Sequence, residues 1–72
     1  MSTPFSIQII NTEESAREYV RIYAGSPECL TDEALYLNAT EFVNAHPDDL
    51  TDEQRDALRD AWLSASREAL SE

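Results

Sequence analysis

Cys29 and His46 are the side chains best suited to nucleophilic or metal chemistry, and each is the only residue of its type. Nucleophilic catalysis requires a base beside the nucleophile, so His46 would have to serve in every such site. One thiol and one imidazole do not complete a tetrahedral zinc site. His46 precedes Pro47 at an expected helix end, where the helix dipole favours a histidine, and Glu28 beside Cys29 disfavours the reactive thiolate. We therefore predict no catalytic residue, no cofactor and no metal.

Carboxylates are numerous enough to suggest acid–base or calcium chemistry, but their pattern is typical of neither. A working acid–base pair needs a partly dry pocket that separates two pKa values, and a short helical chain has little interior space for one. Asp48, Asp49, Asp52 and Glu53 cluster between two expected helices, as in a calcium-binding loop. An EF-hand loop requires a glycine at its sixth position, and Gly25 is the only glycine in the chain. The sequence therefore indicates a protein that is not an enzyme.

The acids of the C-terminal third form the densest charged cluster in the chain. On a helix, Asp52, Asp56 and Asp60 form a ridge with a charge about every 6 Å, which follows from the rise of roughly 1.5 Å per residue. Either the helix dipole and solubility account for these acids, or the ridge imitates a phosphate backbone, whose charges lie about 3.4 Å apart along one strand of duplex DNA. On the second interpretation the partner-binding residues are Asp48, Asp49, Asp52, Glu53, Asp56 and Asp60.

The overall charge restricts the class of partner. Among 72 residues, 15 are Asp or Glu and 5 are Lys or Arg, which gives a formal net charge of -10. Nucleic acid and anionic lipid attract positive charge, so direct contact with nucleic acid or with a membrane is not expected. A negative field steers a protein towards basic surfaces. We therefore expect the partner to present the basic surface of a protein or of a protein–nucleic-acid complex.

Length and hydrophobic content indicate one small acidic helical domain over residues 1–72. Hydrophobic residues make up 42% of the chain, which is too much for a sequence that stays disordered. A chain of this length buries only about 60% of the surface that it exposes when unfolded, and self-association would enlarge its core. No stretch approaches the roughly 20 apolar residues needed to span a bilayer. With a lone cysteine in addition, the cytoplasm is the expected compartment.

Capping residues and breakers predict three helices. The first covers residues 13–24, begins at Asn11 or Thr12 and stops at Gly25. The second begins at Thr31 and ends before a proline.

The third helix begins with a capping box formed by Thr51 and Gln54 and continues to the end of the chain. The apolar residues of each helix recur at the spacing of one buried face. The three faces are expected to carry Ala16, Tyr19, Val20 and Tyr23, then Leu35, Ala39, Phe42 and Val43, and finally Leu58, Ala61, Trp62, Ala65 and Ala69.

Residues 5–10 read Phe-Ser-Ile-Gln-Ile-Ile, an alternation of apolar and polar side chains rich in β-branched residues. This pattern predicts a short, half-buried strand. A single strand needs partners for its backbone groups, so it would lie across the helices or pair with its copy in a second chain. The predicted fold is therefore mainly α, a three-helix bundle with a short N-terminal extended strand.

In length, overall charge and the cluster from Asp48 to Asp60, the chain resembles the small acidic inhibitors encoded by bacteriophages and other mobile elements, of which anti-CRISPR proteins are one group. The resemblance includes no motif. It implies a viral inhibitor that blocks a nucleic-acid-binding surface of a host defence complex. Such inhibitors are diverse in fold, so the resemblance assigns no role to individual residues.

Two alternatives to an acidic inhibitor remain open at this stage. The first is a small structural or regulatory homodimer with an apolar interface, because aromatic residues are favoured as interface anchors. Core packing is the competing explanation for the same residues. The second is an accessory subunit of a larger catalytic assembly. The candidate anchors of the dimer are Tyr19, Tyr23, Tyr36 and Trp62.

Overall fold

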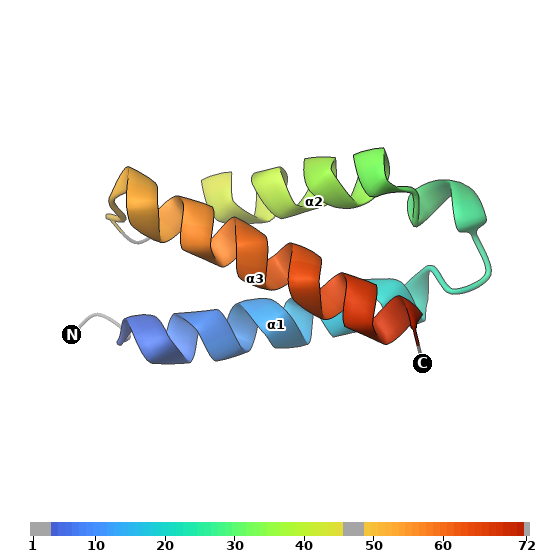
Figure 1. Ribbon diagram of the computed structural model, residues 1–72, viewed down its shortest axis with the longest axis horizontal. Helices are drawn as coiled ribbons and strands as arrows, with labels where there is room; N and C mark the ends of the chain where they lie inside the picture. Colours follow the sequence, from blue (N-terminus) through green and yellow to red (C-terminus); the bar gives the residue numbers. More distant parts are fainter. Residues whose placement is uncertain (1–3, 46–48, 72) are drawn as a thin grey trace.

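The computed structural model describes residues 4–45 and 49–71, which form three α-helices and one short 3-10 helix. In chain order these are α1 (Phe5–Ile22), η1 (Pro27–Cys29), α2 (Asp32–Asn44) and α3 (Asp52–Leu70). The helix α3 packs against both α1 and α2 and lies between them (Figure 1). The mainly helical class and the three-helix bundle are therefore confirmed.

The predicted strand at residues 5–10 is wrong, because these residues form the first turns of α1, and no strand occurs within residues 4–45 and 49–71. The helix begins after Pro4, whose carbonyl oxygen accepts hydrogen bonds from Ile7 N at 3.0 Å and Gln8 N at 3.1 Å. The expected N-terminal caps, Asn11 and Thr12, consequently lie inside the helix. The start at Pro4 is consistent with the fixed backbone angle that proline supplies to a first helical turn.

The composition of the buried face of α1 explains why residues 5–10 were wrongly predicted to form a strand. Its buried residues are Gln8, Thr12, Ala16 and Val20, which are spaced four apart as on one side of a helix. Two of these four are polar, so the first half of the helix shows no apolar helical period. The Thr12 hydroxyl donates to the Gln8 carbonyl oxygen at 2.7 Å and so satisfies its own buried group within the helix.

The caps predicted for α2 and α3 are confirmed. The Thr31 hydroxyl oxygen accepts from Ala34 N at 3.2 Å at the start of α2. At the start of α3, Thr51 Oγ1 accepts from Gln54 N at 3.1 Å, and Gln54 Oε1 accepts from Thr51 N at 3.0 Å. This reciprocal pair is a complete capping box, which fixes the first turn of α3.

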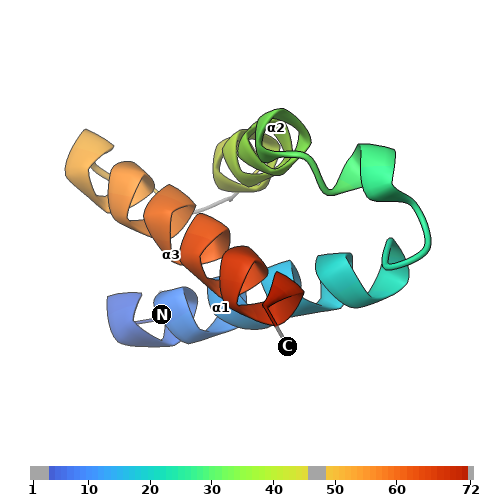
Figure 2. The same cartoon turned by 45° about the vertical axis from the view of Figure 1, so that its right-hand side comes forward.

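The core lies where small residues allow the helices to approach α3. Trp62, at 2% exposure, is its largest member. Ala16 of α1, Ala39 of α2 and Ala65 of α3 belong to the same cluster and are buried. Seen after a turn about the vertical axis, α1 and α2 diverge on either side of α3 (Figure 2). The remaining core residues are Leu35 and Leu63, with Tyr19, Leu30 and Phe42 packed against the cluster.

Most residues of the three predicted apolar faces are buried, with exceptions at the edges. Tyr23, expected to face the core, is 39% exposed. Leu63 and Ser66 are buried although the predicted face of the third helix did not include them. The Ser66 hydroxyl donates to the Leu63 carbonyl oxygen at 2.8 Å, so this polar residue is satisfied inside the core.

Replacing Ile10 by proline tests the helical start of α1. Ile10 lies in the interior of the helix and its side chain is 49% exposed. The proline removes a helical hydrogen bond and clashes with the preceding turn, so we expect a loss of about 3 kcal/mol in the free energy of unfolding. Urea unfolding followed by circular dichroism measures this loss.

Ile10→Ala is the matched control, because it removes the same side chain without disturbing the helix. We expect it to change stability by no more than about 0.5 kcal/mol. Equal stabilities of Ile10→Pro and Ile10→Ala would show that residues 5–10 are not helical.

Candidate functional site

The predicted acidic surface consists of Asp48, Asp49, Asp52, Glu53, Asp56 and Asp60. Asp48 lies outside the described residues. The other five are exposed, and four of them lie on α3. The spacing expected for Asp52, Asp56 and Asp60 is therefore present on a single helix. Asp52 and Glu53 are in its first turn, where the dipole stabilises negative charge.

Arginines interrupt this acidic surface on the side that faces α2. Arg59 Nη2 donates to Asp56 Oδ1 at 2.7 Å, and its guanidinium carbon lies 5.4 Å from the centre of the Tyr36 ring of α2. A depression of about 220 Å³ between α2 and α3 is lined on the α3 side by Asp52, Arg55, Asp56 and Arg59. Within residues 4–45 and 49–71, Asp49, Glu53 and Asp60 take part in no ion pair. Among the described residues, arginines therefore compensate part of the charge of the acidic surface on the side that faces α2. They leave Asp49, Glu53 and Asp60 without an ion pair.

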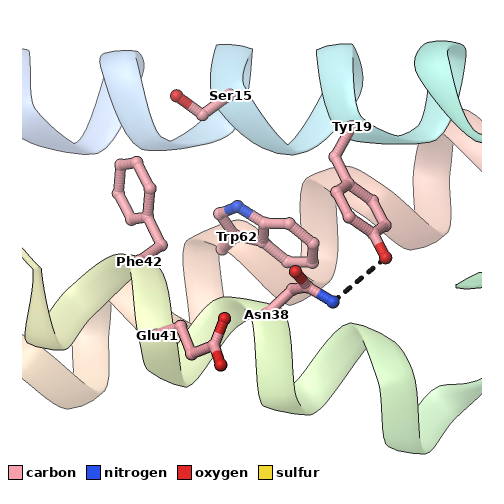
Figure 3. Close-up of a pocket in the computed structure, with 6 residues that line it drawn as sticks. All are labelled: Ser15, Tyr19, Asn38, Glu41, Phe42 and Trp62. Carbon is pink, nitrogen blue, oxygen red and sulfur yellow. Dashed lines mark hydrogen bonds between the residues drawn. The ribbon is translucent and has the colours of Figure 1, made fainter.

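A second candidate site, the aromatic pocket, lies between α1 and α2 above Trp62 of α3 (Figure 3). Its volume is about 340 Å³. In Figure 3 the Phe42 ring points from α2 towards α1, and the indole of Trp62 lies between the two helices. No local sequence pattern indicates this pocket, because its lining residues come from three different helices. Its lining residues are Ser15, Tyr19, Asn38, Glu41, Phe42 and Trp62.

Hydrogen bonds fix one end of the aromatic pocket. The Tyr19 hydroxyl donates to the Cys29 carbonyl oxygen at 2.8 Å and accepts from Asn38 Nδ2 at 3.0 Å. Asn38 Nδ2 also donates to the Ala34 carbonyl oxygen at 2.8 Å. The Tyr19 ring lies 5.3 Å from the Trp62 ring, measured between centroids, and is tilted by 60° to it. Tyr19 thus connects α1, η1, α2 and α3.

Burial raises the pKa of Tyr19 above its usual value, since the phenolate would lose hydration. The nearby Cys29 and Tyr23 raise the pKa further through charge repulsion. The Tyr19 and Tyr23 ring centroids are 4.6 Å apart. Tyr19 therefore remains a neutral hydrogen-bonding group at physiological pH, which suits a structural role at the end of the pocket.

The four aromatic residues considered as dimer anchors have different environments. Trp62 is a core residue at 2% exposure, and Tyr19 is half-buried. Tyr23 and Tyr36 are exposed, but Arg59 covers one face of the Tyr36 ring. Trp62 therefore has little surface to offer a second chain.

Of the two residues first considered for catalysis, Cys29 alone lies within residues 4–45 and 49–71. Cys29 is half-buried in η1, and its backbone oxygen is the atom that contacts Tyr19. His46, which was expected at a helix end, lies outside the described residues. Among residues 4–45 and 49–71, no three His, Cys, Asp or Glu side chains are arranged to hold a metal ion.

Within the described part of the chain, none of the helices combines the length and the apolar character that crossing a membrane requires. Comparisons with models of protein families, with curated proteins and with solved structures gave no match.

Replacing Tyr19 by phenylalanine tests its role in joining the helices. The variant loses the hydrogen bonds to Cys29 and from Asn38, so we expect the free energy of unfolding to fall by about 1 kcal/mol. The raised pKa stabilises the native chain fully below the unfolded tyrosine pKa of about 10, and this contribution is lost as pH rises through the native pKa. Urea unfolding between pH 7 and alkaline pH measures both effects.

Tyr23→Phe is the control for the pH series, because Tyr23 is exposed. The stability of Tyr19→Phe is expected to fall less steeply above about pH 10 than that of the native chain or of Tyr23→Phe. Identical pH profiles for all three chains would contradict the burial of the Tyr19 hydroxyl.

Proposed function

We propose that this protein is a non-enzymatic inhibitor that binds another protein through the acidic surface of α3 and the residues before it. The surface occupies a basic site on the partner that otherwise binds nucleic acid. The observation that carries this proposal is the exposure of Asp49, Asp52, Glu53, Asp56 and Asp60 together, with Asp56 alone among them joined to an arginine within the described residues.

The position of these acids on a packed helix supports recognition. The buried side chains of Leu58 and Trp62 hold α3 in the core, and the capping box fixes its first turn. The backbone positions of Asp52, Glu53, Asp56 and Asp60 are consequently ordered before a partner binds. A preordered surface loses less conformational entropy on association than a mobile acidic tail, which favours affinity.

The net charge favours a basic protein surface over other partners. At -10, the chain is repelled by phosphate backbones and attracted by the positive grooves that bind them. A protein that fills such a groove excludes nucleic acid from it. The resemblance to small acidic phage-encoded inhibitors is in accord with this mechanism, and a host defence complex of the kind blocked by anti-CRISPR proteins is a partner of the required chemistry.

A homodimer with an apolar interface is the second candidate, and exposed apolar side chains favour it. Ile22 is 66% exposed and Leu37 is 57% exposed. Two chains of charge -10 repel each other, and salt screens this repulsion. Sedimentation across a salt series therefore separates the candidates, because a homodimer strengthens with salt whereas a complex with a basic partner weakens.

Reversing Asp52, Asp56 and Asp60 together to lysine tests the acidic surface. The native chain and the triple variant serve as parallel baits in a host lysate at low and high salt, and the captured proteins are identified by mass spectrometry. We expect the native chain to retain a basic nucleic-acid-binding protein that excess duplex DNA elutes. The variant is expected to lose this protein by at least about tenfold, since removing charged contacts of this kind costs more than roughly 1.4 kcal/mol.

The matched control reverses Glu14, Glu28 and Glu68, which are exposed and lie outside the acidic surface. Both triple variants change the net charge equally, so a loss confined to the α3 variant assigns binding to that surface. Circular dichroism checks that all chains are helical. Equal capture by the two variants, or capture that DNA does not reverse, would exclude the proposed inhibition.

A further inference from the structure

We propose that the aromatic pocket between α1 and α2 binds the guanidinium group of an arginine side chain presented by a partner protein. This contact is separate from the acidic surface of α3 and goes beyond the proposed inhibition. The two sites lie on opposite sides of α2, because Asn38, Glu41 and Phe42 line the pocket and Thr40, Val43 and Asn44 line the depression that includes Asp52 and Asp56.

The chemistry of the pocket matches that of a guanidinium group. Phe42 and Tyr19 provide half-buried aromatic rings, with the buried Trp62 between them (Figure 3), and a cation is attracted to such a ring within about 6 Å of its centre. Glu41 provides an exposed carboxylate on the α2 side of the pocket (Figure 3). Arginine combines flat stacking on rings with a forked pair of donors for a carboxylate, which lysine does not.

The molecule already contains this combination of groups elsewhere. Arg59 lies 5.4 Å from the centre of the Tyr36 ring and donates to Asp56 Oδ1 at 2.7 Å. That cation is supplied by the chain itself, from α3 to α2. In the aromatic pocket a ring and a carboxylate come from adjacent positions of the same helix, at Phe42 and Glu41, and none of the arginines in the described part of the chain lines it.

The distribution of charge leaves this pocket negative. Arg17 and Arg21 line a pocket of about 380 Å³ against Ala69, and Arg55 and Arg59 line the depression between α2 and α3. Among residues 4–45 and 49–71, Glu41 is the only charged residue that lines the aromatic pocket, and it forms no ion pair with another described residue. An incoming cation therefore meets an uncompensated carboxylate in a strongly negative overall field.

The aromatic pocket is a shallow depression that is open to solvent and ordered at its Tyr19 end. Its volume of about 340 Å³ is near the lower end for ligand pockets, which begin at about 300 Å³. The Tyr19 hydroxyl is held by Cys29 and Asn38, so its ring is fixed before a ligand arrives. A pocket that is ordered in advance loses little entropy on binding.

Trp62 is the only tryptophan, so intrinsic fluorescence reports directly on this pocket. The probe is an acetylated and amidated alanine-based peptide with arginines four residues apart, titrated at physiological salt. The first control is the same peptide with citrulline in place of arginine, which preserves shape and removes charge. The second control replaces each arginine by lysine, which keeps the charge and removes the planar fork of donors. We expect a saturable fluorescence change with the arginine peptide, and an affinity at least about tenfold weaker for the citrulline and lysine peptides.

Glu41→Gln tests the carboxylate, and Glu68→Gln is its matched control because it removes the same charge from an exposed site on α3. We expect Glu41→Gln to weaken binding of the arginine peptide about tenfold, whereas Glu68→Gln changes it less than twofold. Phe42→Leu keeps an apolar side chain and removes the ring, so it should also weaken binding. Circular dichroism establishes that each variant is folded.

Equal affinity for the arginine and citrulline peptides, or equal weakening by Glu41→Gln and Glu68→Gln, would overturn the proposal. The variant with Asp52, Asp56 and Asp60 reversed separates it from the function proposed for α3. At physiological salt exposed charges are screened beyond about 8 Å, so this variant should keep the fluorescence response. Loss of the response in that variant, with Glu41→Gln unaffected, would place arginine binding on α3 and not in the aromatic pocket.

Discussion

The packing of α1 and α2 around Trp62 of α3 determines most of what this protein presents at its surface. Trp62 is almost completely buried, and the alanines at positions 16, 39 and 65 allow three backbones to approach its indole ring. A side chain of this size between two flanking helices holds them apart while contacting both. Its burial contributes more apolar area than any other single residue of this small core can, and small domains have little stability in reserve.

The aromatic pocket is a direct consequence of that packing. The helices α1 and α2 pack on α3 and diverge from each other (Figure 2). Trp62 of α3 therefore lines the space between them, together with Tyr19 and Phe42 (Figure 3). The hydrogen bonds of Tyr19 to η1 and α2 then keep this end of the molecule in one arrangement. Trp62 belongs to the core and also lines the aromatic pocket. A substitution of Trp62 would therefore lower the stability of the fold and disrupt the pocket.

Electrostatic interactions contribute little to the stability of this helical bundle. The one ion pair between described side chains, Arg59 with Asp56, is exposed, and such pairs contribute at most about 1 kcal/mol. The excess of carboxylates therefore adds little to folding and mildly opposes it through repulsion. Its effect is on association, since a net charge of -10 selects basic partners and disfavours self-association at low salt.

Features that depend only on neighbouring residues could be predicted before the tertiary structure was known. Thr31, Thr51 and Gln54 marked the starts of α2 and α3 correctly, because a cap is formed within one helical turn. The net charge and the exposed acids of α3 also follow from composition and helical spacing. The remaining features depend on contacts between helices that are far apart in the sequence. Residues 5–10 alternate as in a strand, but in the bundle they form the first turns of α1, whose buried face begins with the polar residues Gln8 and Thr12. The aromatic pocket joins Ser15, Asn38 and Trp62 from three helices, and no local pattern encodes which side chains meet across helix interfaces.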